Sequence, residues 1–319
     1  MRYKYIENAD IDVSALSAGT WGVGGDRWGA SADPSGSVDA IRAMIDGGVN
    51  IIDTSPAYGE GVSEQIVGEA LQDGYRNKVL LATKFSRITG EGNTIIHDGS
   101  YENAIRECEA SLLRMKTDCI DIFIQHWPAP DYPIEETMGA LVDLKKAGKI
   151  RFVGVSNFDQ DLIEQASKAI SIDFLQHHYS MLNETNTKLF EWCKLQGIGV
   201  MTYGSLGGGI LTGAVRNIPE WDKTDFRLSF YGKFYREPVF SRIMSLLDVL
   251  DEISIERGKP VSQISINWTT QKPFVSTAIC GVRSVANAAQ NCAAFDWELS
   301  EEEVCRIDEK LKEIDLQEA

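Results

Sequence analysis

Short apolar runs rich in valine and isoleucine recur along this chain, and each is followed by a stretch with the periodicity of an amphipathic helix. Strands that are apolar along their whole length are typical of parallel sheets buried on both faces. With an opening run at Val13–Gly19, the chain has about eight such strands, the number that a closed (β/α)8 barrel needs. The other runs are Asn50–Asp53, Val79–Lys84, Ile120–His126, Ile150–Ser156, Ile172–Gln176, Ile198–Tyr203 and Val275–Gly281.

The remaining segments favour one barrel domain over residues 1–319. Helices are predicted at Ser37–Asp46 and Ile134–Ala147, and each is followed by glycine, which commonly ends a helix. Ser300–Glu303 has the pattern of a capping box and predicts the start of the last helix, with its glutamates in solvent. Tyr3–Val13 predicts a hairpin that plugs the bottom of the barrel. We therefore expect a single α/β TIM-type barrel with an N-terminal β-hairpin and extra C-terminal helices.

The composition excludes several classes of function. The chain of 319 residues has a formal net charge of −16, so it is poorly suited to nucleic acid or anionic membranes. No apolar run approaches membrane-spanning length, and the N-terminus lacks the apolar core of a signal peptide. The six cysteines are scattered without a C-x-x-C pair, which indicates reduced thiols. We therefore expect a cytoplasmic protein that binds neither nucleic acid nor membranes.

Polar residues mark the ends of three apolar runs. Asp53, Lys84 and His126 end these runs, and Tyr58 follows Asp53 by five residues. Functional groups of a barrel gather at the C-terminal strand ends, so the four are expected to meet. Lys84, paired with Asp53, should lower the pKa of Tyr58 from its usual value of about 10. Tyr58 could then protonate a carbonyl oxygen that His126 positions. The hydride that completes a reduction must come from a nicotinamide cofactor.

Later strand ends carry groups suited to the nicotinamide. Ser156, Asn157 and Gln176 supply hydroxyl and amide groups for its carboxamide, and Tyr203 offers a flat face for stacking. These residue types at successive strand ends strengthen the prediction of a nicotinamide site.

Two further segments are suited to the phosphates of the same cofactor. The glycines of Gly204–Gly209 would let backbone N–H groups converge on a pyrophosphate. Gly281–Ser284 leads into a helix, and its N–H groups and Arg283 suit a phosphate at the adenosine end. Because Arg283 is the only basic residue of Gly281–Asn291, NADPH is favoured, and NADH is the alternative.

Six motifs in this order resemble the signatures of the aldo-keto reductase superfamily, and the resemblance runs from about Gly19 to about Asn291. The overall pattern is most similar to bacterial members active on aldehydes, ketones or sugar-like polyols. The motifs are Asp53–Gly59, Ala82–Phe85, Gln125–Pro128, Gly154–Phe158, Leu206–Gly213 and Gly281–Arg283.

The resemblance implies a role for each matching residue. The family's catalytic tetrad falls on Asp53, Tyr58, Lys84 and His126. Where many members have Tyr-Ser-Pro-Leu, this chain has Tyr203–Leu206 with a glycine in second place. The cofactor-binding residues that we assign are Gly19, Thr20, Trp21, Asp53, Ser156, Asn157, Gln176, Tyr203, Gly204, Ser205, Leu206, Gly208, Gly281, Arg283, Asn287 and Asn291.

Large side chains beside the tetrad predict the substrate pocket. Trp21, Phe85 and Trp127 are expected to wall it together with Tyr58 and His126. For Phe85, packing in the core is an equal alternative. The chain stops soon after its last helix, so the pocket is expected to be open or completed by a neighbouring subunit of a homo-oligomer.

Two other features have competing interpretations. The long stretch Gly204–Phe240 contains many aromatic residues and is either a lid over the cofactor or a small surface core. His177 and His178 are adjacent, so on a strand they point to opposite faces and do not share a metal. We expect no metal site.

Two alternatives to a carbonyl reductase remain. One is a regulatory barrel that binds the cofactor and turns over slowly. The other is an enzyme that retains NAD(P) and oxidises, then re-reduces, one sugar.

Overall fold

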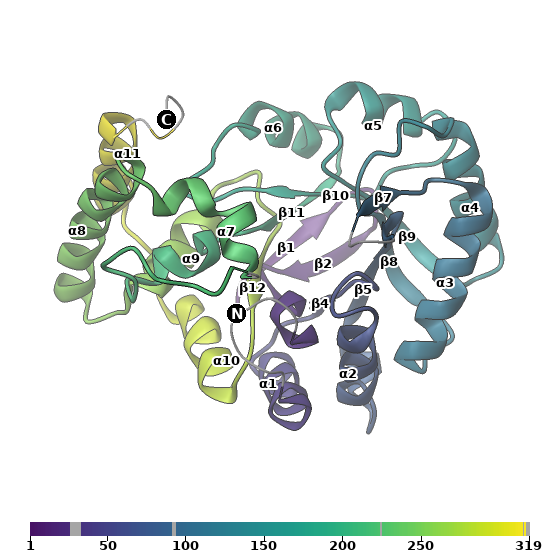
Figure 1. The fold of residues 1–319 in the computed structure, drawn as a ribbon, viewed down its shortest axis with the longest axis horizontal. Helices are drawn as coiled ribbons and strands as arrows, with labels where there is room; N and C mark the ends of the chain where they lie inside the picture. The colour runs from purple at the N-terminus through teal and green to yellow at the C-terminus, as the bar shows by residue number, and fades with distance from the viewer. Residues whose placement is uncertain (26–32, 91–93, 224, 315, 317–319) are drawn as a thin grey trace.

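Eight parallel strands form a closed barrel in the computed structural model, which describes residues 1–25, 33–90, 94–223, 225–314 and 316. The strand order around the barrel is β10-β11-β12-β3-β4-β5-β8-β9, and helices surround it (Figure 1). The predicted (β/α)8 architecture is therefore confirmed. The strands are β3 (Leu16–Gly19), β4 (Ile51–Asp53), β5 (Leu80–Phe85), β8 (Ile120–Gln125), β9 (Ile150–Ser156), β10 (Phe174–His178), β11 (Gly199–Tyr203) and β12 (Thr277–Gly281).

Several strands begin later than their apolar runs, and two of them show a physical reason. The opening run splits at Ala15, because Val13 and Ser14 pair with the N-terminal strand and only Leu16–Gly19 joins the barrel. Strand β10 begins at Phe174. Just before it, the Asp173 carboxylate accepts a hydrogen bond from the backbone N–H of Val153 (2.8 Å). The Asp173 side chain thus accepts the hydrogen bond that a backbone carbonyl of a longer β10 would otherwise accept from β9.

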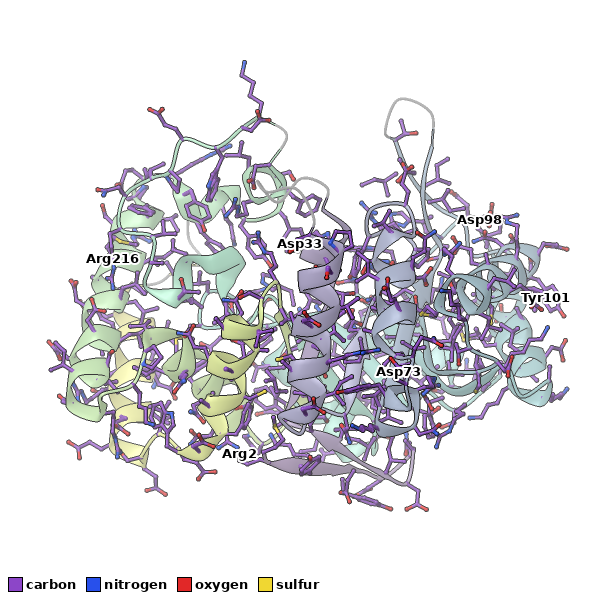
Figure 2. All side chains as sticks on the ribbon, turned by 90° about the horizontal axis from the view of Figure 1, so that it is seen from below. Arg2, Asp33, Asp73, Asp98, Tyr101 and Arg216 are labelled. Carbon is purple, nitrogen blue, oxygen red and sulfur yellow. The ribbon has the colours of Figure 1, made fainter. Side chains whose placement is uncertain are left out.

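The N-terminal hairpin closes one end of the barrel. It pairs β1 (Tyr3–Ile6) with β2 (Ile11–Ser14), and Ile6 and Val13 pack in the cluster that fills the barrel interior. The backbone N–H of Asn8 donates to the carbonyl of Gly197, just ahead of β11 (3.1 Å). The hairpin therefore lies at the N-terminal ends of the strands, as predicted (Figure 1). In Figure 2, Arg2 lies at this end of the molecule, and Asp33 and Asp98 lie nearer the other.

The helices bury one face each against the barrel and against one another, in a large core cluster outside the strands. Helices α8 and α11 run side by side at one edge, beyond the regular strand–helix alternation (Figure 1). The α-helices are α1 (Pro34–Asp46), α2 (Val62–Ala70), α3 (Tyr101–Met115), α4 (Ile134–Lys146), α5 (Gln160–Ala166), α6 (Thr187–Leu195), α7 (Phe226–Phe230), α8 (Val239–Arg257), α9 (Val261–Gln271), α10 (Val285–Cys292) and α11 (Glu301–Ile314).

Two short strands and several 3-10 helices lie in the loops between these helices and strands. Strands β6 (Arg87–Thr89) and β7 (Ile95–His97) form a second antiparallel pair just after β5. The 3-10 helices are η1 (Trp21–Gly24), η2 (Tyr75–Lys78), η4 (Gly207–Thr212), η5 (Gly232–Tyr235) and η6 (Ala293–Asp296). Within the described ranges, no helix is long and apolar enough to cross a membrane.

The start of α11 is a capping box, as predicted. The backbone N–H of Ser300 donates to the Glu303 carboxylate (2.6 Å), and the N–H of Glu303 donates back to the Ser300 hydroxyl (3.2 Å). The prediction that all three glutamates face solvent is wrong for Glu303, which is buried. Its carboxylate also binds the guanidinium of Arg257 on α8. This pair ties the last helix to its neighbour.

Candidate active site

The structure brings Asp53, Tyr58 and Lys84 into one hydrogen-bonded cluster at the C-terminal ends of the strands. Lys84 is fully buried, and its ammonium donates to both Asp53 carboxylate oxygens (2.8 Å each). The same nitrogen lies 2.8 Å from the carbonyl of Thr54 and 3.2 Å from the phenol oxygen of Tyr58. The end of β4 and the loop after it thus give Lys84, on the neighbouring strand β5, four acceptors that hold its ammonium directly beside the phenol.

His126 joins this cluster from the end of β8. Its backbone N–H donates to the carbonyl of Phe85 (2.9 Å), and its ring centroid lies 6.1 Å from that of Tyr58. The Ser55 hydroxyl lies 3.4 Å from Nδ1 of the imidazole. Ser55 belongs to the same motif as Tyr58, so one loop positions both rings.

The expected effect of Lys84 on the Tyr58 phenol is wrong. Burial raises the pKa of Tyr58 well above its usual value, the Asp53 carboxylate raises it further, and Arg87 acts in the opposite direction. The pKa of the phenol is thus raised although the Lys84 ammonium lies 3.2 Å from its oxygen. The phenol therefore stays protonated at neutral pH, which is the form that a proton donor needs.

The imidazole of His126 is neutral. Burial lowers its pKa well below the usual range, and the positive charges of Lys84 and Arg87 lower it further. A neutral ring has one N–H and one acceptor nitrogen. It can therefore bind a polar substrate group without adding charge to the site.

A cavity of about 1330 Å³ opens beside the cluster. Asp53, Tyr58 and His126 line one part of it, and Trp21 and Trp127 line it as predicted. The other predicted cofactor residues that line the cavity are Gly19, Ser156, Asn157, Gln176, Tyr203, Gly204, Ser205, Leu206, Gly208, Gly281, Arg283, Asn287 and Asn291.

Two residues predicted to contact the cofactor or the substrate lie outside this cavity. Phe85 is buried and stacks on Phe123 with ring centroids 4.8 Å apart, so it belongs to the core. Its side chain alternates with that of Lys84 along β5, so the two point to opposite faces of the barrel wall. Thr20 is also buried, and its hydroxyl donates to the carbonyl of Asp53 (2.9 Å). Both predictions of direct contact are corrected: Thr20 supports Asp53 from behind.

The predicted carboxamide-binding residues are already linked to the cluster. The Gln176 amide donates to the Asp53 carboxylate (2.7 Å). The Asn157 amide donates to the carbonyl of His126 (3.1 Å) and to the Ser156 hydroxyl (3.0 Å), and its oxygen accepts from Tyr203 (2.8 Å). The backbone N–H of Asn157 donates to the carbonyl of Gln176 (3.1 Å), so one network joins the proposed proton-transfer groups to the predicted nicotinamide site.

The long segment after β11 serves in part as cavity wall and in part as core. Phe226 and Phe230 on α7 line the cavity, and the Phe226 ring meets Trp21 edge-on, with centroids 4.5 Å apart. By contrast, Trp221 packs edge-on against the buried Tyr235 at 4.4 Å. The interpretation as a cover over the cavity thus fits Phe226 and Phe230, and the interpretation as a small core fits Trp221 and Tyr235.

The glycine-rich turn at the start of this segment leaves room for phosphate oxygens. Gly208 has a φ of +68°, and a Cβ there would lie 2.7 Å from the Tyr231 ring, so the turn requires glycine. Gly209 has open space where a Cβ would stand. The buried Ser205 hydroxyl has no hydrogen-bond partner among the described residues. An orphaned hydroxyl beside open backbone fits the pyrophosphate of a dinucleotide.

The far end of the cavity carries mixed charge. Arg283 precedes α10, which Ser284 caps by accepting from the N–H of Asn287 (3.2 Å). Asp225 from the long segment also lines this end and binds the guanidinium of Arg227 through both carboxylate oxygens (2.8 and 2.6 Å). Sequence reasoning missed this pair, because nothing in the local pattern places residue 225 opposite the last strand.

The two adjacent histidines have structural contacts. His178 stacks on Tyr203 with ring centroids 5.4 Å apart, and His177 accepts from the backbone N–H of His178 (2.9 Å). Across the described ranges, no three His, Cys, Asp or Glu side chains gather in a way that could hold a metal ion.

Sequence reasoning also missed Arg87 and His97, which line the cavity beside His126. Arg87 follows Lys84 by three residues, and that proximity was the available signal. The partner strand that brings His97 beside it was not recognisable, because Ile95–His97 is too short to show a period.

Comparisons with known proteins agree with this geometry. Residues 15–312 match the aldo/keto reductase family. The NADH-specific methylglyoxal reductase of Escherichia coli (strain K12) is 30% identical over 92% of this chain and 93% of its own.

Solved structures are similar along nearly the whole chain. The glycerol dehydrogenase AKR11B4 of Gluconobacter oxydans has a TM-score of 0.89 and 31% identity, covering 99% of this chain and 96% of its own. An aldo/keto reductase of Klebsiella pneumoniae, solved with NADP and acetate, has a TM-score of 0.74 and 29% identity, covering 94% and 92%. The chain therefore belongs to the aldo/keto reductase family and is an aldo-keto reductase.

Proposed function

We propose that this enzyme reduces a small aldehyde, ketone or sugar-like carbonyl to the alcohol, with Tyr58 as the proton donor and NADPH as the preferred cofactor. The observation that carries the proposal is the Tyr58 phenol on the cavity wall, hydrogen-bonded by the buried Lys84 ammonium at 3.2 Å. The cofactor, when bound, supplies the hydride that no side chain can give.

The residues that would hold the cofactor lie along the cavity in a suitable order. Gln176 and Ser156 would bind the carboxamide, and Tyr203, whose other face stacks on His178, would pack against the nicotinamide ring. The turn with the orphaned Ser205 hydroxyl would bind the pyrophosphate. Arg283 would bind the adenosine end.

Proton transfer follows from the charges around Tyr58. The phenol is neutral before reaction, because burial raises its pKa. When Tyr58 gives its proton to the carbonyl oxygen, a phenolate remains. A hydrogen bond from Lys84 and the positive charge of Arg87 would stabilise this phenolate. His126 would orient the carbonyl: a Ser55 hydroxyl that donates to Nδ1 leaves the ring proton on Nε2, which would then donate to the substrate.

The preference for NADPH rests on Arg283. A guanidinium binds a 2′-phosphate through charge-assisted hydrogen bonds, which NADH cannot form. The neighbouring Arg227 is already bound by Asp225, so the phosphate would depend chiefly on Arg283.

Turnover measurements test this function. Purified enzyme should oxidise NADPH with a panel of small aldehydes at ordinary enzymatic rates, and NADH less efficiently. Cofactor binding without turnover on any aldehyde, ketone or sugar would instead support a regulatory barrel. Cofactor that remains bound through gel filtration, with turnover only on one sugar, would support the internally cycling enzyme.

A further inference from the structure

Arg87 and His97 lie side by side at the substrate end of the cavity. They are directly paired residues of the antiparallel strands β6 and β7, so their side chains stand on the same face. Both line the cavity, together with Thr89 and Ile95 from the same two strands. The β6–β7 hairpin therefore forms a wall opposite the cofactor-binding loops.

This wall is fixed to the loop that carries His126. The Ser86 hydroxyl, one residue before Arg87, donates to the carbonyl of Trp127 (3.1 Å). The backbone carbonyl of Ser86 also accepts from the N–H of Asp98, next to His97 (2.8 Å). These bonds hold the start of β6, and with it the backbone of Arg87, beside His126 and Trp127.

The charge at this end of the cavity is carried by Arg87. Burial and the nearby guanidinium lower the pKa of His97, so its ring is neutral at pH 7. Among the described residues that line this end of the cavity, Asp53 has its carboxylate bound by Lys84 and Gln176, and Glu60 is exposed. The positive charge of Arg87 acts on both Tyr58 and His126: it opposes the rise in the pKa of Tyr58 and adds to the fall in the pKa of His126.

We propose that Arg87 makes this enzyme selective for carbonyl substrates that carry an anionic group, a carboxylate or a phosphate, near the carbonyl. An arginine binds either group through paired N–H donors. A protein with a net charge of −16 would otherwise repel such a substrate. This inference rests on the proposed carbonyl reduction and deepens it by naming the substrate class.

Matched substrate pairs test the proposal in the complete enzyme. One pair is 4-formylbenzoate and its methyl ester, which differ by the carboxylate charge, and the other is glyceraldehyde 3-phosphate and glyceraldehyde. The wild type should show a higher kcat/KM for the charged member of at least one pair. The pair that shows it identifies the anion as carboxylate or phosphate.

Variants of Arg87 show whether this residue causes the preference for charged substrates. Arg87→Gln should lower the charged-to-neutral ratio of kcat/KM about tenfold or more, mainly through KM, as expected for a lost charge-assisted bond. Arg87→Lys should keep most of the ratio. Arg306→Gln is the matched control, since it removes the same charge on α11, where Arg306 pairs with Glu252 and Glu256. That variant should leave the ratio unchanged.

Two outcomes would overturn the proposal. One is a wild type that reduces the neutral members as well as or better than the charged ones. The other is an Arg87→Gln variant that lowers kcat equally for charged and neutral substrates, which would mean that Arg87 acts only through Tyr58. If the wild type reduced no carbonyl compound at all, the proposed function itself would fail, and the two failures are thereby distinguished.

Discussion

The two ends of the cavity are built by different means. At the end proposed for proton transfer, Asp53 and Lys84 are almost completely buried, and Asp53, Lys84 and His126 start at or directly after the ends of barrel strands. At the other end, the wall is a long segment of short helices and glycine turns, held by packed rings such as Phe226 on Trp21. The first end depends on strand register, and the second depends on side-chain packing between loops.

This difference shows which part of the site needs precisely placed atoms. Proton transfer requires atoms within hydrogen-bond distance, and the barrel provides this because neighbouring strands have a fixed register. The pairs Asp53 with Ala82 and Lys84 with Ile124 are examples of that register. A large cofactor spreads its contacts over many groups, so loops with a few hydrogen bonds suffice to bind it. Four changes, taken from the largest expected effect to the smallest, test this contrast.

Tyr58→Phe removes the proposed proton donor and little else. We expect kcat for reduction to fall by about 10²–10⁴, the range typical for losing a general acid. Cofactor affinity, measured by fluorescence titration, should remain near the wild-type value. A variant with near-normal kcat would show that the buried end does not perform the proton transfer.

Lys84→Met leaves the Asp53 carboxylate buried without its partner. Breaking a buried pair in this way costs about 3–5 kcal/mol of folding stability, measured by urea unfolding. The double variant with Asp53→Asn should recover part of that loss, because it removes the unpaired charge. If the single variant were as stable as the wild type, the side chains around Asp53 would have to rearrange to accommodate its unpaired charge. This end of the cavity would then be less rigid than the strand register implies.

His177→Gln tests the strand between the two ends. Burial lowers the pKa of His177 to about 4, so the folded protein keeps this ring neutral where the unfolded chain protonates it, below about 6.5. The unfolded state therefore gains a proton as the pH falls, and the native state loses up to about 2 kcal/mol between pH 7 and pH 5. The stability of the variant relative to the wild type should improve by up to that amount at pH 5. A difference that stays constant with pH would contradict this account.

Arg283→Ala tests the loop-built end. NADPH binding should weaken about tenfold or more, corresponding to about 1.4 kcal/mol, while NADH binding should change little. Dissociation constants for both cofactors give the comparison. Equal losses for the two would place Arg283 on a part of the cofactor that they share, and the NADPH preference would lose its support.

The sequence predicted which residues meet around Tyr58 better than it predicted the rest of the cavity. Asp53, Lys84 and His126 end apolar strands, and chain order alone places such ends together in a barrel. Thr20 and Phe85 were misplaced, because a motif gives neighbours in the chain and not the direction of a side chain. Arg87 was missed because its place in the cavity depends on β6 pairing with β7.

The sequence by itself determined the barrel, its hairpin and the cluster around Tyr58, because strand periodicity and strand-end residues are local signals. The tertiary structure alone decided the electrostatics: burial keeps the Tyr58 phenol protonated and the His126 imidazole neutral, opposite to the expected lowering at Tyr58. It also decided which rings of the Gly204–Phe240 segment face the cavity. Desolvation and packing depend on every group around an atom, and most of those groups are distant in the chain.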